Sequence, residues 1–349
     1  MVAPRRPRAR IAVLASTNTW NAYNFGGRSN YINADRLPER PIVNARQDLE
    51  RYHDPNPFGT WKKKDEEYLP LSFDRPEPHN HLFDDPEPSD PVQGRVQCGQ
   101  APGEWRLYAW LEQEGWEYDL YAEAQLHEGT LSLDDYKVLI IAVHPEYWTR
   151  EMYLAVKSWV FERGGRLMYL GGNGLNCEVT ISSEWAMRCL THVNSLGGEL
   201  GGHSDDGKVE YESRLHRTLE SEANLLGVVC TAAGIMTAAP YRVIDASHWI
   251  FEGTGLSNGD LFGEKTLHER VPGGASGHET DKRSSSSPPN TILLAKGTNL
   301  DNGGAEVFFH ETPRAGGVFS VGSITWVPAL FVDPVVARMT RNVLHFFLR

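Results

Sequence analysis

Short apolar runs bounded by polar residues recur along the chain, and this pattern predicts strands that are buried on both faces. The predicted strands lie at residues 10–15, 117–121, 136–143, 166–170, 291–295, 305–309 and 317–321. Elsewhere apolar residues recur every three or four positions, which is the spacing of one face of a helix. Such helices are predicted at 104–114, after the capping residue Thr149 as far as Gly164, and at 333–349.

The order of these elements predicts the fold class. Strands that are separated by single helices pair in parallel through right-handed crossovers. We therefore expect an α/β fold with a doubly wound, mostly parallel, flavodoxin-like sheet, formed as one domain over residues 1–349. Two loop-rich insertions are expected to interrupt it, at about 24–104, where prolines and aromatic residues are frequent, and at about 176–290.

Composition narrows the range of partners and compartments. Lys and Arg number 34 against 46 Asp and Glu, a net charge of −12, whereas nucleic-acid binders show basic patches. The 4 cysteines have no CxxC spacing, which favours free thiols in a reducing compartment. No apolar stretch has the length of a signal peptide's core or of a membrane span. We expect a cytoplasmic protein that binds neither nucleic acid nor membranes.

A histidine and a glutamate follow the predicted strand at 136–143. The sequence of residues 143–148 is Val-His-Pro-Glu-Tyr-Trp, so Pro145 separates His144 from Glu146. Proline biases the residue before it toward extended backbone, and extended residues two apart point to the same side. Both side chains are therefore expected at the carboxyl end of the sheet, where open α/β sheets bind ligands. The alternative is a hydrogen-bonded pair that only stabilises the end of the strand.

Two further loops carry polar residues. Gly-Gly-Asn-Gly at residues 171–174 is either a tight turn or a strand–turn–helix elbow with Asn173 at its apex. Asparagine cannot attack a carbonyl, but its amide can donate to a developing oxyanion or orient a water. Ser-Gly-His-Glu-Thr-Asp at 276–281 combines one histidine with two carboxylates, and the alternative is a solvated charged loop.

Several familiar motifs are absent from the sequence. It has no HExxH or CxxC zinc spacing, no GxSxG, no GxxxxGK[ST], and no GxGxxG after the first predicted strand. These absences argue against serine esterases, phosphate-loop NTPases and standard dinucleotide enzymes. The aromatic segment at residues 18–27 follows the first predicted strand, so it belongs either to a site at the same edge of the sheet or to a lid without chemistry.

Four segments together resemble one family: NTWNAYNFGGRSNY at 18–31, EYLPLSFDRPEP at 67–78, the stretch from VHPEYW to NGLNCE at 143–178, and GASGHETD at 274–281. They are similar to the carboxyl-terminal half of the N,N-dimethylformamidase large subunit, which has a class I glutamine amidotransferase-like fold. The resemblance implies hydrolysis of a small N,N-dialkyl formamide to formate and a dialkylamine. It also implies one mononuclear Fe(III) ion, held by two tyrosines and one glutamate.

Motif by motif, the resemblance implies the residues of the site. The metal ligands would be Glu146, Tyr23 and Tyr68, with Tyr31 as a competitor of Tyr68. Phenolate and carboxylate are hard oxygen donors that suit Fe(III), and three protein ligands leave positions open for water and substrate. The polar residues that the family places around the metal correspond to His144, Asn173 and Glu279.

These residues predict an iron-dependent hydrolase that uses metal-activated water on an N-alkylated amide. Either Glu279 or His144 would act as the general base, while Asn173 helps to hold the oxyanion. Two alternatives remain: a hydrolase of another small C–N substrate at the same iron site, and a metal-free amidotransferase-like module that binds a ligand or partner. The family enzyme has a further amino-terminal region, which this chain is expected to lack. It also has a small subunit, so a small partner subunit, a homo-oligomer or both are open expectations.

Overall fold

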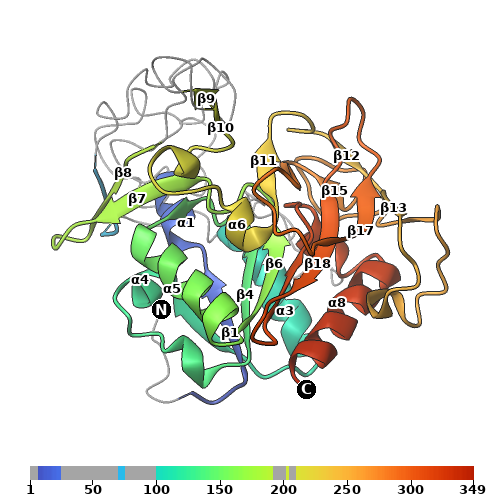
Figure 1. The fold of residues 1–349 in the computed structure, drawn as a ribbon, viewed down its shortest axis with the longest axis horizontal. Helices are drawn as coiled ribbons and strands as arrows, with labels where there is room; N and C mark the ends of the chain where they lie inside the picture. Colours follow the sequence, from blue (N-terminus) through green and yellow to red (C-terminus); the bar gives the residue numbers. More distant parts are fainter. Residues whose placement is uncertain (1–6, 25–69, 75–99, 192–201, 204–209) are drawn as a thin grey trace, which may run out of the picture.

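The core of the molecule is a nine-stranded sheet, and one half of it is parallel (Figure 1). The computed structural model describes residues 7–24, 70–74, 100–191, 202–203 and 210–349. The parallel strands are β1 (Ile11–Ala15), β3 (Asp119–Ala122), β4 (Val138–Val143), β6 (Arg166–Gly171) and β19 (Gly317–Ser320). Their order, β3-β1-β4-β6-β19, is the flavodoxin-like order. The predicted doubly wound α/β class is confirmed.

Beyond β19 the sheet continues with antiparallel strands. They are β18 (Glu306–Glu311), β17 (Ile292–Gly297), β13 (Tyr241–Val243) and β14 (Leu261–Phe262). Short loops join β17 to β18 and β18 to β19. Such loops permit only antiparallel pairing, because parallel neighbours need a crossover of about a dozen residues or more. The parallel pairing expected from the sequence therefore holds for the core of the sheet and not for this extension.

Helices cover both faces of the sheet, because successive residues of a buried strand point to opposite sides. Ile11 and Val13 of β1 pack with α3 (Ala101–Gln113), α7 (Trp326–Ala329) and α8 (Pro334–Phe347). Ala12 and Leu14 of the same strand pack with α4 (Glu123–His127), α5 (Arg150–Glu162) and α6 (Ala223–Leu226). The predicted cap of α5 is present, since the Thr149 side chain accepts a hydrogen bond from the Met152 amide.

Smaller elements surround this core. Helix α1 (Thr17–Ala22) follows β1, and a four-stranded sheet has the order β2-β8-β7-β5. Its strands are β2 (Leu71–Ser72), β5 (Tyr147–Trp148), β7 (Cys177–Ile181) and β8 (Ala186–Cys189). Three strand pairs are β9 (Gly202–His203) with β10 (Glu210–Tyr211), β11 (Val229–Thr231) with β16 (Thr280–Lys282), and β12 (Ala238–Ala239) with β15 (Ser276–Gly277).

The predicted strand–turn–helix elbow after β6 is wrong in its last part, because the turn leads into strand β7. Cys177, Val179 and Ile181 alternate with polar residues, which is the period of a strand. The turn also pairs with the chain that leaves β4: the Leu175 amide donates to the Pro145 carbonyl at 2.7 Å. This pairing holds the segment extended, so no helix can form there.

Parts of the predicted organisation fall outside the described residues. Most of the first expected insertion, at about 24–104, lies there, and the single-domain organisation with two insertions stays a prediction. The second expected region, at about 176–290, contains β7 to β16. Within the described residues, none of the helices combines the length and the apolar character that a membrane crossing requires.

One buried histidine makes the stability of the sheet dependent on pH. His310 on β18 is 1 % exposed, and neither ring nitrogen has a hydrogen-bond partner among the residues that the structure describes. Burial lowers its pKa from the usual 6.5 to about 4. The unfolded chain therefore takes up a proton near pH 6.5, whereas the folded protein resists protonation down to about pH 4. The stability that this residue contributes is fully present above pH 6.5 and is lost as the pH falls through that window.

We expect His310→Phe to make unfolding less sensitive to acid. The phenyl ring keeps the contacts that the imidazole makes with Phe161 and Phe308 but takes up no proton. Urea unfolding of both proteins at pH 7 and pH 4 measures the effect. The variant should lose about 3 kcal/mol less of its unfolding free energy between these two pH values. Parallel losses in the two proteins would contradict this role of His310.

Candidate functional site

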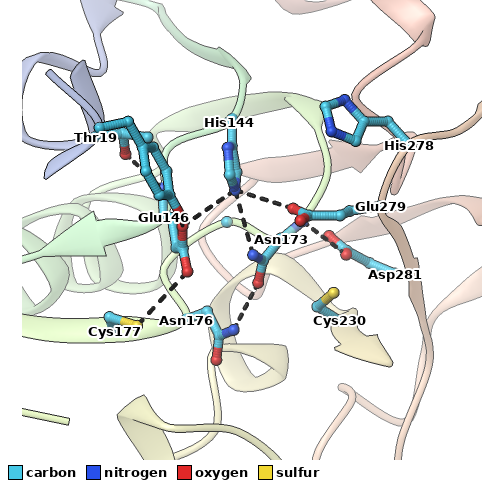
Figure 2. Close-up of polar contacts among 12 residues, drawn as sticks. Thr19, His144, Glu146, Asn173, Asn176, Cys177, Cys230, His278, Glu279 and Asp281 are labelled. Atoms are coloured by element: carbon cyan, nitrogen blue, oxygen red, sulfur yellow. Dashed lines mark hydrogen bonds and ion pairs between the residues drawn. The ribbon is translucent and has the colours of Figure 1, made fainter. Parts of the chain in front are cut away.

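The candidate site lies where the carboxyl ends of β1, β4 and β6 meet, at the point where the strand order reverses. His144 and Glu146 follow β4, Asn173 follows β6, and Glu279 lies between β15 and β16. Tyr23 is the residue directly after α1. Contacts link all five of these predicted residues, and Figure 2 shows how the first four face one another. The fold thus gathers residues that are far apart in the sequence.

His144 is at the centre of the site. Its Nε2 lies 3.0 Å from Glu279 Oε2 and 3.3 Å from Glu146 Oε2, so the ring bridges two carboxylates (Figure 2). The Tyr23 ring stacks on the imidazole with ring centroids 5.7 Å apart. Val143, the preceding residue, has a φ of 62°, which is a strained conformation for a β-branched side chain. This turn redirects the chain at the end of β4 and brings His144 and Glu146 together.

The charges in the site determine the protonation states of His144 and Glu279. Burial by itself would lower the pKa of His144, but the negative charges of Glu279 and Glu146 outweigh burial and raise it to about 9. Burial would likewise raise the pKa of Glu279, but the charge and hydrogen bond of His144 lower it to about 2. In the protein alone, His144 is therefore an imidazolium and Glu279 a carboxylate at neutral pH.

Tyr23 and Glu146 are the two predicted metal ligands that the structure describes, and they are adjacent. The Tyr23 hydroxyl is in direct contact with Glu146 Oε2. Burial, followed by the charges of Glu146 and Glu279, raises the pKa of Tyr23 well above its usual value. A cation at this place would have the opposite effect and would favour the phenolate. Tyr68 and its competitor Tyr31 lie outside the described residues.

The donor atoms fit a hard cation only if tyrosine takes part. Across the described parts of the chain, no group of three or more histidine, cysteine, aspartate and glutamate side chains is placed to hold a metal ion. The contact between the Tyr23 phenol and the Glu146 carboxylate instead offers two hard oxygen donors at one point, a type of donor that suits Fe(III). The described donors are therefore compatible with the ligand set that the sequence resemblance implies.

Asp281, which the sequence analysis did not single out, holds the turn that carries Asn173. Its Oδ1 accepts from the Asn173 amide at 2.8 Å and its Oδ2 accepts from the Tyr169 hydroxyl at 2.6 Å. Asn176 Nδ2 donates to Asn173 Oδ1 at 2.6 Å, which turns Asn173 Nδ2 toward His144 Nε2, 3.2 Å away. With a φ of 51°, Asn173 adopts the left-handed conformation that asparagine tolerates. The signal for Asp281 was present, because it ends the SGHETD motif.

Arg214 is a second residue of the site that sequence reasoning missed. Its Nη1 lies 3.3 Å from Glu146 Oε1 and 3.7 Å from Cys177 Sγ, and the side chain is 11 % exposed. This buried cation compensates part of the negative charge that two glutamates bring to the site. Residue 214 lies in an irregular region without periodicity or motif, so no sequence signal pointed to it.

Two buried hydrogen bonds hold helix α1, and with it Tyr23, against the rest of the site. The Glu146 amide donates to Thr19 Oγ1 at 2.9 Å, which ties the helix to the chain after β4. Near its start, the Asn18 amide donates to Glu123 Oε2 at 2.7 Å, so the Glu123 side chain from α4 caps α1. Because both bonds are buried, Tyr23 has little freedom to move away from Glu146.

Comparison with known proteins identifies relatives of this chain. Residues 1–337 match a family model described as N,N-dimethylformamidase beta subunit-like, C-terminal. The N,N-dimethylformamidase beta subunits of Paracoccus aminophilus and of an Alcaligenes species are 28% and 27% identical over 299 residues. Each alignment covers 74% of this chain and 38% of the relative, so the chain spans well under half the length of these relatives.

Solved structures give weaker similarity. The cytoplasmic protein STM1381 of Salmonella typhimurium LT2 is 14% identical, with a TM-score of 0.39. The alignment covers 69% of this chain and 86% of that protein.

Proposed function

Because this chain belongs to the N,N-dimethylformamidase beta subunit-like C-terminal family, we propose that it is an iron-dependent hydrolase of small N-alkylated amides. The substrate class would be that of N,N-dimethylformamide, and the products would be formate and a dialkylamine. The sequence similarity to the two beta subunits is distant and covers only part of them. The family is shown, and the substrate and the metal are therefore what we propose.

One observation carries the proposal. Tyr23, His144, Glu146, Asn173 and Glu279 come from four separate segments and meet at the carboxyl end of the parallel sheet. A structural pair at the end of a strand would need only His144 and Glu146. The gathering of three acidic or phenolic groups around one buried histidine supports a functional site, since buried charges are costly and collect where a function uses them.

Tyr23 and Glu146 are the described residues that would hold the iron, and Tyr68 would supply the third oxygen from outside the described residues. Bound Fe(III) would act as a Lewis acid toward the amide carbonyl and would acidify water. Arg214 would keep Glu146 Oε1 oriented, because its guanidinium lies against that oxygen.

Glu279 is the better candidate for the general base. Its pKa of about 2 leaves it unprotonated at neutral pH, whereas His144 already carries a proton. In the proposed reaction, water adds to the formyl carbon and passes a proton to Glu279. The C–N bond then breaks, and Glu279 passes the proton on to the departing nitrogen. His144 holds Glu279 in place at 3.0 Å, and Asn173 Nδ2 is available to the tetrahedral oxyanion.

The partner and the compartment belong to the same proposal. The two curated relatives are named as beta subunits, so we propose that this chain also works with a small partner subunit, with further copies of itself, or with both. The cysteine composition supports a cytoplasmic location.

Metal analysis combined with a formate-release assay tests the proposed function. We expect about one iron per chain and release of formate from N,N-dimethylformamide among a panel of small amides. If the protein contains iron but hydrolyses another C–N substrate, the proposed substrate is wrong and the proposed iron site stands. Full folding without iron and without turnover of any amide would contradict the proposal and favour a ligand-binding or partner-binding module.

A further inference from the structure

A pair of buried histidines lies next to the proposed general base. His278 precedes Glu279 in the chain, and its Nδ1 is 2.9 Å from His268 Nε2. The two rings cross at 76° with centroids 4.8 Å apart, and the residues are 7 % and 1 % exposed. His268 in turn is held by the loop around it, because its Nδ1 accepts from the Val271 amide at 3.1 Å.

These contacts determine where the protons of the pair are. A backbone N–H can only donate, so His268 Nδ1 must be unprotonated and a neutral His268 carries its proton on Nε2. That proton is donated to His278 Nδ1, which must therefore be an acceptor as well. Burial, the largest cause, lowers the pKa of His268 well below its usual value and that of His278 to about 4, so both rings are neutral at neutral pH. The proton of His278 is consequently on Nε2.

The Nε2–H of His278 is left as a donor without an acceptor. Among the described residues, the only hydrogen bond of the His278 ring is the one that its Nδ1 makes with His268. Figure 2 shows the ring extending from its loop toward the side of the site where His144 lies. A neutral N–H can only donate, so it is free to bind an oxygen acceptor that enters the site.

The backbone of His278 is held in a strained conformation that aims the ring. Its φ of 65° lies in the left-handed region, and both of its backbone groups are bonded to one neighbouring turn. The His278 amide donates to the Thr237 carbonyl at 2.9 Å, and the Met236 amide donates to the His278 carbonyl at 2.6 Å. Strain of this kind persists only where the surroundings impose it, and it collects at ligand-binding positions.

We propose that His278 is a catalytic hydrogen-bond donor whose Nε2–H binds the carbonyl oxygen of the amide substrate, and that His268 is the positioning residue that fixes this tautomer. The inference rests on the proposed amide hydrolysis and adds a substrate contact that the sequence motifs did not assign. As the carbonyl oxygen gains negative charge, this hydrogen bond strengthens, so it favours the transition state over the bound substrate.

Two substitutions at His278 separate this role from a structural one. His278→Gln places an amide NH near the position of Nε2, whereas His278→Asn reaches only as far as Nδ1. Asparagine is the better residue for the left-handed backbone, so a purely structural role predicts that His278→Asn is the milder change. The proposed role predicts the reverse: kcat/KM for N,N-dimethylformamide should fall about 10²–10³-fold in His278→Asn and clearly less in His278→Gln.

The positioning role of His268 has a spectroscopic test. In full-length protein with 15N-labelled histidine, prepared with little iron so that the signals stay sharp, both histidines should carry the proton on Nε2. His268→Gln still donates to His278 Nδ1 and should preserve its tautomer. His268→Glu, of the same size, offers only acceptors, so it should move the His278 proton to Nδ1 and lower kcat/KM to the level of His278→Asn.

The outcomes distinguish this inference from the proposed function. A wild-type protein that hydrolyses no amide refutes the proposed function and the substrate contact with it, although the tautomers can still be measured. An active wild-type protein with unimpaired His278→Asn refutes the inference alone. A proton on Nδ1 of His278 in the wild-type protein also refutes it, whatever the kinetics show.

Discussion

Replacing Tyr23 with phenylalanine is expected to remove most of the bound iron and to lower amide hydrolysis more than about 100-fold, beyond the loss typical of residues that only support a ligand. The change deletes one oxygen that contacts Glu146 Oε2 and leaves the ring that stacks on His144. Iron content per chain and formate release measure the effect. The visible absorption that tyrosinate gives to Fe(III) should disappear with the metal, whereas zinc or magnesium would give no such colour.

Tyr147 provides the matched control. Its hydroxyl donates to the Tyr23 hydroxyl at 3.3 Å, and its ring meets the Tyr23 ring edge to face, 5.8 Å between centroids. Tyr147→Phe thus removes a hydroxyl at similar depth and leaves the contact between Tyr23 and Glu146 in place, so it should keep the iron. Equal iron loss in both variants would mean that the packing of the site, and not a Tyr23 ligand, holds the metal.

The other two predicted ligands extend the test. Glu146→Gln removes a charge while keeping the shape, and it should lower iron content as Tyr23→Phe does. Some loss of stability should accompany it, because Arg214 would be left as a buried cation without its carboxylate. Tyr68→Phe should also lower iron content, and Tyr31→Phe should leave the colour intact. If Tyr31→Phe loses the iron and Tyr68→Phe keeps it, then Tyr31 is the second tyrosine ligand, and the other assignments stand.

Glu279→Gln is expected to keep the iron and to lose about 10²–10⁴-fold in turnover, which is the usual contribution of a proton-transfer group. Glutamine preserves the size of the side chain and can still lie beside His144, but it cannot accept a proton from water. Formate release at saturating substrate and iron analysis of the same preparation give the two values. Near-normal turnover with full iron would remove Glu279 from the role of base.

Glu222 offers a control for the loss of a buried glutamate. It accepts a hydrogen bond from Ser213, and burial raises its pKa well above the usual range. Glu222→Gln keeps the size of the side chain at a position outside the proposed reacting groups, so turnover should be preserved. His144→Ala addresses the alternative assignment: a severe loss there combined with a mild loss in Glu279→Gln would transfer the base role to His144.

The sequence by itself determined the core of the fold and the place of the candidate site. The apolar run at 138–143 predicted β4, because a strand in a parallel sheet is buried on both faces and every residue of it is therefore apolar. The spacing of apolar residues in α5 and the cap at Thr149 are equally local signals. His144 and Glu146 could be placed at the edge of the sheet because they directly follow such a strand.

Only the tertiary structure decided which distant groups meet there. Three contacts join residues that no periodicity or spacing rule pairs with each other: the Asn173 amide donates to Asp281, Arg214 lies against Glu146, and the His268 ring contacts His278. The strand after Asn173 and the antiparallel half of the sheet were likewise set by pairing with other segments. The pattern of buried residues in a helix or strand can be read from that segment alone. A hydrogen bond between two loops depends on how the whole chain brings the loops together.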